Sequence, residues 1–383
     1  MGLASRLLSR GAAAGIALAI AGAPTAEAQS VLDAELRLAP QFVRYQVHSP
    51  ADETISELAV PLFVTIPAGS RLTFDVGTAY ARAVVTSGAE RSEIRGLSDT
   101  QIRGNLTLGS DLVVLTAGVS LPTGDASITL EQLAAAGRIG NDFLAFPVSN
   151  MGTGLAATGG IAVAYPVGLW NLGIGAAARR SASYEPFDVP GQRFRYQPGN
   201  EVRARLGVDR PVASGRIALG VTYSVFGRDE AAGSAYNTGD RVIAQGVLSG
   251  LLGSHDYTVA AYNVFRGPGN YASGDRAGRE NVANLFLSLG FDAAGTLVEP
   301  SVELRHWMQS VYPAAGMGGA SRSQSSRLAT FGIRTRIGVG PLNVYPSAGY
   351  TAFGRLAVED ADGRPADADI TGFKAQLAIR IAP

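Results

Sequence analysis

Hydrophobic and polar side chains alternate along this chain in runs of about ten to fourteen residues. Residues of equal parity lie on one face of a β-strand, so this period of two predicts strands with one apolar and one polar face. Leu72, Phe74 and Val76, for example, alternate with Thr73 and Asp75. About sixteen such runs are expected, near residues 32–47, 55–66, 70–86, 98–109, 111–121, 154–166, 169–182, 199–212, 215–227, 240–252, 255–266, 280–292, 295–309, 326–339, 342–355 and 369–381.

The runs are joined by two kinds of connection. Short turns rich in Gly, Pro and Asp recur through the chain, and longer polar stretches separate the strand pairs between them. Short turns at one end and long loops at the other are typical of outer-membrane barrels. We therefore predict an all-β fold, a transmembrane antiparallel up-and-down β-barrel of about sixteen strands with short periplasmic turns and long extracellular loops. Fourteen strands would fit if a marginal run, such as the first, lay outside the wall, and a soluble β-domain is the alternative.

The N-terminal residues have the three parts of an export signal. Arg6 and Arg10 precede an apolar stretch at residues 11–22, and Ala26 and Ala28 form a small-x-small cleavage site. We expect residues 1–28 to be a cleaved signal peptide and residues 29–383 to form one barrel domain. No later stretch has about 18 uninterrupted apolar residues, so any membrane insertion must use strands closed into a barrel. The expected location is the bacterial outer membrane.

Composition narrows the possible partners. Lys+Arg and Asp+Glu are both 32, so the formal net charge is zero and no nucleic-acid affinity is implied. The chain has no cysteine, which excludes a disulfide framework. Its 48 glycines and 17 % charged residues suit strands with one polar and one apolar face. The expected partners are outer-membrane lipid and lipopolysaccharide, the outer-membrane assembly machinery and a small-molecule solute, and the oligomeric state is left open.

Several motifs resemble one family of barrels. They are GLSDTQ at residues 96–101, LTAGVSLPTGD at residues 115–125, ELAVP at residues 57–61 and NMGTG at residues 150–154. Together they resemble outer-membrane barrels of the phenol-degradation meta-pathway type, which are similar to the broader group of fatty-acid-transporter-like barrels. The resemblance covers about a third of the chain. It implies a barrel fold and, by analogy, uptake of small and often apolar compounds.

The longest loop, residues 122–153, is the strongest functional candidate. Residues 127–137 are expected to form a short helix, with Thr129 and Gln132 as a capping box. Apolar residues there and in the stretch that follows are too numerous for a loop in water, so we expect the loop to fold against another surface. It could form a constriction inside the barrel or a cap on neighbouring outer loops, and the residues concerned are Leu130, Leu133, Phe143 and Phe146.

Charged side chains on the polar faces would point into the lumen. A barrel of about sixteen strands is wide enough for an aqueous channel, so these side chains could line a pathway. They could instead pair across neighbouring strands and fill the interior. Arginine exceeds acid among the later strands, so an open path there should mildly favour anions. The predicted lumen-lining residues are Asp75, Arg103, Glu201, Arg203, Arg205, Glu303, Arg305, Arg334, Arg336, Lys374 and Arg380.

Catalysis has little support in the sequence. His48, His255 and His306 are the only histidines, and no serine has a compelling histidine partner. Cys/His clusters of metal sites are absent, and no cofactor motif is present. The hypothesis is a non-enzymatic channel or transporter for passive uptake of a small solute, for which a hydrophobic or aromatic compound is one option. A non-conducting structural or surface-interaction barrel is the alternative, and a barrel hydrolase is the third.

Overall fold

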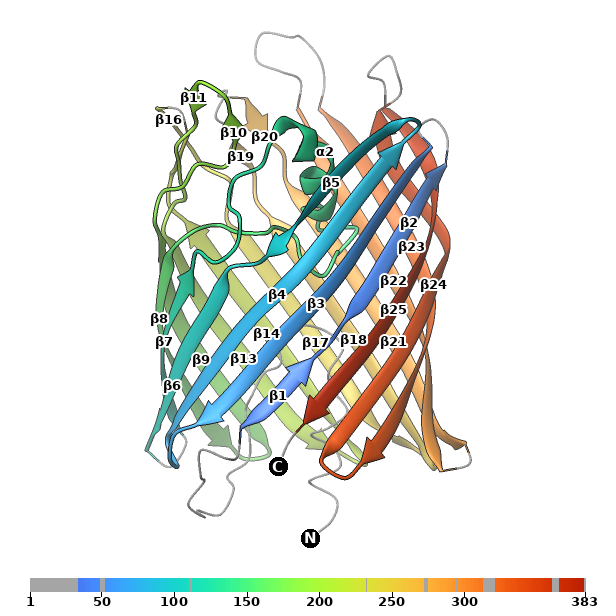
Figure 1. Ribbon diagram of the computed structural model, residues 1–383. Coiled ribbons are helices and arrows are strands. Elements are labelled where there is room, and N and C mark those ends of the chain that lie inside the picture. Colours follow the sequence, from blue (N-terminus) through green and yellow to red (C-terminus); the bar gives the residue numbers. More distant parts are fainter. Residues whose placement is uncertain are drawn as a thin grey trace.

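The fold is one closed β-sheet that wraps around an interior (Figure 1). The computed structural model describes residues 34–48, 52–109, 112–231, 233–271, 275–293, 295–312, 321–359 and 365–381. The expected signal peptide, residues 1–28, lies outside the described residues. Within them, no helix is both long and apolar enough to span a bilayer.

Long antiparallel strands form the wall, and each is paired with its neighbours along most of its length. The wall strands are β1 (Glu35–Leu38), β2 (Gln41–His48), β3 (Glu53–Pro67), β4 (Leu72–Ser87), β5 (Glu90–Leu97), β6 (Thr100–Leu108), β7 (Val113–Leu121), β8 (Ala156–Val167), β9 (Trp170–Ser181), β13 (Glu201–Val212), β14 (Gly215–Phe226), β17 (Arg241–Leu252), β18 (His255–Arg266), β21 (Glu280–Ala293), β22 (Thr296–Val311), β23 (Arg322–Val339), β24 (Leu342–Glu359) and β25 (Pro365–Ile381).

The last strand closes the barrel onto the first ones. β25 pairs with both β1 and β2, and both of these pair with β3. β1 and β2 therefore share one wall position, and β5 and β6 share another beside β4. Over the described residues, the eighteen strands of the sheet thus occupy sixteen wall positions, which confirms the sixteen-strand prediction. The fourteen-strand alternative is wrong because the first run is paired on both sides.

Along the strands, apolar side chains are exposed and charged side chains are buried, which is the reverse of the pattern in a water-soluble protein. Val202 and Leu206 on β13 are 58 % and 51 % exposed, whereas Glu201 and Asp209 on the same strand are 7 % and 1 % exposed. Large apolar side chains cover the outside of the wall, as the hydrocarbon core of a bilayer requires. The fold is a transmembrane antiparallel up-and-down β-barrel, and the soluble β-domain alternative does not explain this surface.

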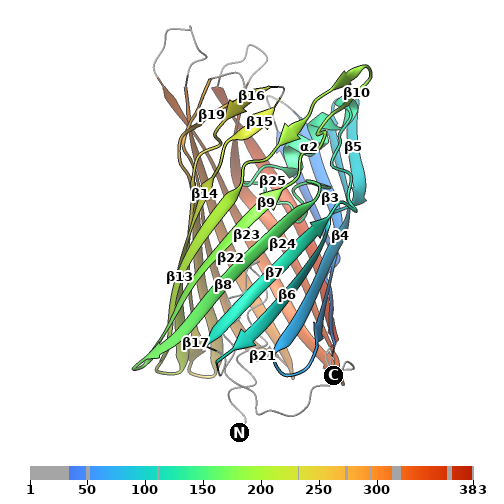
Figure 2. The ribbon, with the colours of Figure 1, turned by 90° about the vertical axis from the view of Figure 1, so that its left-hand side faces the viewer.

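Each predicted run coincides with a wall position, but the long loops contain structure that the alternation did not predict. Figure 2 shows α2 and the short strands β10, β15, β16 and β19 at the end of the barrel opposite the short turns. The additional elements are the 3₁₀ helix η1 (Leu130–Gln132), α2 (Leu133–Ile139), β10 (Asp188–Val189), β11 (Gln192–Arg193), β12 (Tyr196–Gln197), β15 (Asp229–Ala231), β16 (Ser234–Tyr236), β19 (Gly269–Asn270) and β20 (Arg276–Ala277).

Adjacent residues on β8 face opposite sides of the wall, and arginine substitutions can test this assignment. Ile161 is 47 % exposed on the outer face, and its neighbour Ala162 points inward. We expect Ile161→Arg to lower the free energy of unfolding by about 2–4 kcal/mol, because the charge would lie in lipid near the bilayer centre. Ala162→Arg should cost less than about 1 kcal/mol. Urea titration of the folded protein in lipid vesicles measures both, and equal losses would contradict the facing assigned to β8.

Candidate functional site

The long loop, residues 122–153, is folded into a short helical unit followed by an apolar stretch, and we call it the inner segment. Its helix begins as η1 and continues as α2. The Thr129 N–H donates to Gln132 Oε1 at 3.0 Å, which is one half of the expected capping box. Leu130 and Leu133 do not take part in the expected packing against another surface, since these side chains are 68 % and 48 % exposed.

The buried face of the helix lies one step further along the chain. Ala135 and Ile139 are buried, at the i, i+4 spacing of an α-helix. The sequence prediction missed this face because it treated residues 127–137 as one continuous α-helix. The change from η1 to α2 at Leu133 rotates the side chains that follow, since a 3₁₀ helix has fewer residues per turn.

The apolar stretch after α2 belongs to the main hydrophobic core. Phe143 and Phe146 are 1 % and 6 % exposed. The ring of Phe146 lies edge-to-face against Tyr45 of β2, with centroids 5.6 Å apart. The wall contributes inward-facing apolar residues from strands on both sides of the β25 seam, including Ile55, Ala81, Leu328 and Ile370. The core therefore lies between the inner segment and the wall.

Polar contacts fix the inner segment to distant parts of the wall. Val148 N–H donates to Glu57 Oε1 on β3 at 2.9 Å, and Tyr45 O–H donates to the Leu144 carbonyl at 3.3 Å. Arg305 Nη1 on β22 donates to the Phe143 carbonyl at 2.6 Å. β22 and β3 are separated in the wall by β23, β24, β25 and the first wall position. The inner segment thus connects two arcs of the inner surface.

The helix itself is held by β3 and β5. Arg138 Nη2 forms an ion pair with Glu53 Oε2 at 2.8 Å. Ser92 Oγ accepts the Ala135 N–H at 3.1 Å and donates to the Glu131 carbonyl at 2.5 Å. A buried hydroxyl that both donates and accepts leaves no backbone group unpaired at this contact.

Asp99 joins the two ends of the inner segment. Its carboxylate accepts the Gly124 N–H at 3.2 Å and the Thr153 N–H at 2.6 Å. Beside it, Thr123 Oγ1 accepts the Thr100 N–H at 2.8 Å. We call these five residues the clasp. Three of the motifs found in the sequence, at residues 96–101, 115–125 and 150–154, therefore meet at one place.

Gly124 is required at the clasp by close approach of the backbone. A Cβ atom at this position would lie 1.9 Å from the Met151 carbonyl oxygen and 2.7 Å from the Leu97 carbonyl oxygen. Both neighbours are backbone atoms that cannot rotate away. The glycine therefore allows the backbone at the start of the inner segment to contact the backbone at its end.

A cluster of charges lies where the wall meets the inner segment. Glu303 on β22 is paired with Arg305 and, through Oε2, with Lys374 Nζ of β25 at 2.6 Å, and Asn284 Nδ2 donates to Glu303 at 2.7 Å. Lys374 crosses β24 and β23 to reach β22, since Gly349 lies beside it in register. A Cβ on Gly349 would lie 2.8 Å from Lys374 Cε, so the missing side chain makes room for the lysine.

Most of the other predicted lumen-lining residues have polar partners. Asp75 accepts hydrogen bonds from Thr65 and Asn105, and Glu201 pairs with Arg203 at 2.8 Å. In the part of the chain that the structure describes, Arg103 and Arg205 have no hydrogen-bond or ion-pair partner. The remaining pairs are Arg334 with Glu299 at 2.7 Å, Arg336 with Asn343 at 3.2 Å and Arg380 with Glu35 at 2.9 Å.

The inner surface of the wall has a covered half and an accessible half. Ala81 and Ala83 on β4 face the inner segment and are fully buried. Thr158 and Ala162 on β8 also face inward, yet both are exposed. Glycine and alanine predominate on the inward face of β8, and Gly173, Gly175 and Ala177 lie on that of β9, so the wall carries little side-chain volume there. The space beside the inner segment is therefore accessible along β6–β9 and β13.

Sequence reasoning missed the contacts that Tyr45, Glu57 and Asp99 make with the inner segment, although it places Glu57 on a polar face that points into the lumen. Glu57 is fully buried and Asp99 is 9 % exposed. The sequence contained a signal for Glu57 and Asp99, because both lie inside motifs that were assigned only to turns and strands. Tyr45 is on a strand with alternating polarity, and nothing in the local pattern marks its contact with Leu144.

The clasp can be tested with matched glycine variants. Gly124→Ala should loosen the inner segment, because the new methyl group cannot be accommodated beside the Met151 carbonyl. We expect trypsin to cleave after Arg138 at least about tenfold faster, while the stability of the barrel changes by less than about 1 kcal/mol. Gly137→Ala is the control, since a Cβ there would meet no atom within 4 Å beyond its own helix. Equal cleavage of both variants would refute the role of the clasp.

Comparisons with known proteins give only distant matches. No protein-family model and no curated protein matches the chain. Among solved structures it is similar to in-vitro folded OmpT, an outer membrane protein of Vibrio cholerae (9 % identity, 91 % of this chain and 96 % of that chain, TM-score 0.40). It is also similar to an outer membrane channel of Pseudomonas putida F1 (11 % identity, 94 % of this chain and 100 % of that chain, TM-score 0.37). A third similar structure is a bacterial polysaccharide outer membrane secretin (10 % identity, 91 % of this chain and 99 % of that chain, TM-score 0.45). Similarity at this level does not bear on function.

Proposed function

We propose that the protein is an outer-membrane channel for passive transfer of a small solute, narrowed by the inner segment. The apolar outer surface and the short-turn, long-loop arrangement support the membrane location. The observation that carries the channel proposal is the unequal inner surface. Inward-facing Ala81 on β4 is fully buried, whereas inward-facing Thr158 and Ala162 on β8 are exposed.

This difference indicates a path beside the inner segment. A barrel with sixteen wall positions is wide enough to hold both a folded loop and water. The clasp and the contacts of Glu57, Tyr45 and Arg305 keep the segment on one side of the interior. The path would then run along the inward faces of β6–β9 and β13, and the small residues of β8 and β9 leave the most room.

The solute class follows from the arginines on that path. Arg103 lies between Asp75 and Gly118 in register, and Arg205 lies between Gly175 and Thr222. Because the structure describes no partner for either guanidinium, both can attract an anionic group, as rings of arginine do in anion pores. The glycines beside them leave room for an apolar or aromatic body. A small carboxylate or other organic anion, including an aromatic one, fits this combination best.

A non-conducting barrel is favoured by a different observation. Glu303 is paired with both Arg305 and Lys374, and the core around Phe143 is closely packed against the wall. If the accessible half did not continue to both ends of the barrel, the protein would be a structural element of the membrane. Conductance distinguishes the two functions directly.

The first test compares the mature protein with a variant lacking residues 127–148. The deletion keeps both ends of the clasp, Gly124 and Thr153. We expect steady single-channel conductance in planar bilayers for the parent and at least about a twofold larger value for the variant, because the narrowest part of the path is widened. Heat-dependent mobility in gels verifies folding of both. Silence in both folded proteins would contradict the channel function.

The second test measures ion selectivity. Arg103→Gln with Arg205→Gln should shift the reversal potential in a potassium chloride gradient away from anion preference, because two unpaired positive charges leave the path. Arg82→Gln is the control, since Arg82 is paired with Glu93 at 2.8 Å and faces outward. An unchanged reversal potential in the double variant, or an equal shift in the control, would exclude the proposed path.

A further inference from the structure

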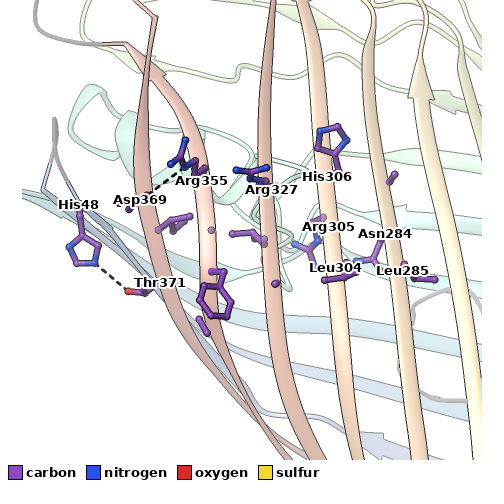
Figure 3. A pocket seen from close by; sticks show the side chains of 17 residues that line it. His48, Asn284, Leu285, Leu304, Arg305, His306, Arg327, Arg355, Asp369 and Thr371 are labelled. Atoms are coloured by element: carbon purple, nitrogen blue, oxygen red, sulfur yellow. Dashed lines mark hydrogen bonds and ion pairs between the residues drawn. The ribbon is translucent and has the colours of Figure 1, made fainter.

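Five outward-facing polar residues form one continuous row across the wall. His306 on β22 is in register with Arg327 on β23, which is in register with Arg355 on β24. Arg355 is opposite Asp369 on β25, which is opposite His48 on β2. Figure 3 shows these side chains on successive strands. All five are exposed on a face that is otherwise mostly apolar, and we call them the polar row.

A hollow lies directly below the polar row. It has a volume of about 950 Å³, and the row forms its upper edge. Leu304 and Phe353 flank it, and Ala329 lies between them in register, so a small side chain sits where its neighbours are large. Ala352 is an extra residue on β24, where the pairing shifts between Thr351 and Arg355. Such a bulge bends the strand locally.

The height of the row coincides with the edge of the apolar belt. His306 is ten residues from Thr296, where β22 begins, and Asp369 is twelve residues from Ile381, where β25 ends. With a rise of about 3.3 Å per residue and a strand tilt of about 40°, the row lies roughly 25–30 Å from the short turns. An outward apolar band is about 25 Å tall, so the row lies where lipid headgroups begin.

The charges of the row suit an anionic headgroup at its β23 and β24 positions. In the described part of the chain, no carboxylate lies within ion-pair distance of Arg327. Arg355 is 3.9 Å from Asp369 and 4.0 Å from Asp367, and all three side chains are exposed. Exposed pairs at these distances contribute little, so Arg355 can accept another anion. The two guanidinium groups are cross-strand neighbours, at the spacing that lets both donate to one phosphate.

We propose that the polar row and the hollow bind a phosphorylated lipid of the outer leaflet. The phosphate would accept hydrogen bonds from Arg327 and Arg355, with His306 beside them, and an acyl chain would fill the hollow over Ala329. Charge and shape select the same occupant, since the cations lie at headgroup depth and the apolar hollow lies on the hydrocarbon side. This inference rests on the proposed membrane location but not on conduction, so it can fail or hold independently of the channel.

The test uses native mass spectrometry of the full mature protein in detergent, titrated with purified diphosphorylated lipid A. We expect saturable binding that weakens at least about tenfold in a variant with Arg327→Gln and Arg355→Gln, because each of the two arginines contributes to the attraction of the anionic lipid and both are removed. Ala329→Phe keeps both arginines but fills the hollow, and should also weaken binding. Arg82→Gln, an outward arginine on β4, is the matched control and should bind as the parent does.

The remaining arms separate the possible ligands. Dephosphorylated lipid A should bind at least about tenfold more weakly than the diphosphorylated form, and inorganic phosphate should not compete at millimolar concentration. Equal binding of the two lipids would overturn the proposal. So would parental affinity in the double arginine variant or an equal loss in Arg82→Gln. Competition by inorganic phosphate together with unchanged binding by Ala329→Phe would show a phosphate site without a lipid and would also overturn it.

Discussion

Closure of the wall by β25 against β1 and β2 is the interaction on which the rest of the structure depends. A strand in hydrocarbon has no water to satisfy its N–H and C=O groups, so every strand needs two neighbours and the sheet can have no free edge. The first run of the chain supplies that last neighbour in two pieces, with Ala39 and Pro40 between them. Once the ring is closed, alternate residues of each strand face the lipid and the interior.

This closure also determines where a hydrophobic core can form. The lipid-facing surface gains nothing from removal of water, so burial of apolar side chains can stabilise the fold only inside the barrel. The inner segment supplies the apolar surface, and inward-facing residues on either side of the seam receive it. Glu303 and Lys374 form an ion pair beside that core, where an unpaired charge would be costly.

The sequence allowed the wall to be predicted almost completely, because a period of two follows directly from one lipid face and one polar face. β5 escaped this pattern because its polarity is reversed: Arg91, Glu93 and Arg95 face outward and Ile94 is buried on the inner side, as a strand that rises into the loops permits. The contacts of the inner segment could not be predicted. Arg305 and Phe143 are 162 residues apart, and only ring closure and inward folding bring them together. Leu130 and Leu133 show that hydrophobicity alone does not assign the buried face of a short helix.

The clasp makes the inner segment an insertion that leaves and rejoins the wall at one place. Its two ends are bound to the same carboxylate. A chain interrupted in this way can exchange its internal part without a change in strand register, because register is set by pairings outside the attachment. The segment between Gly124 and Thr153 is thus a suitable site for peptide replacement. A peptide that binds a chosen analyte could be inserted there to convert the barrel into a sensor.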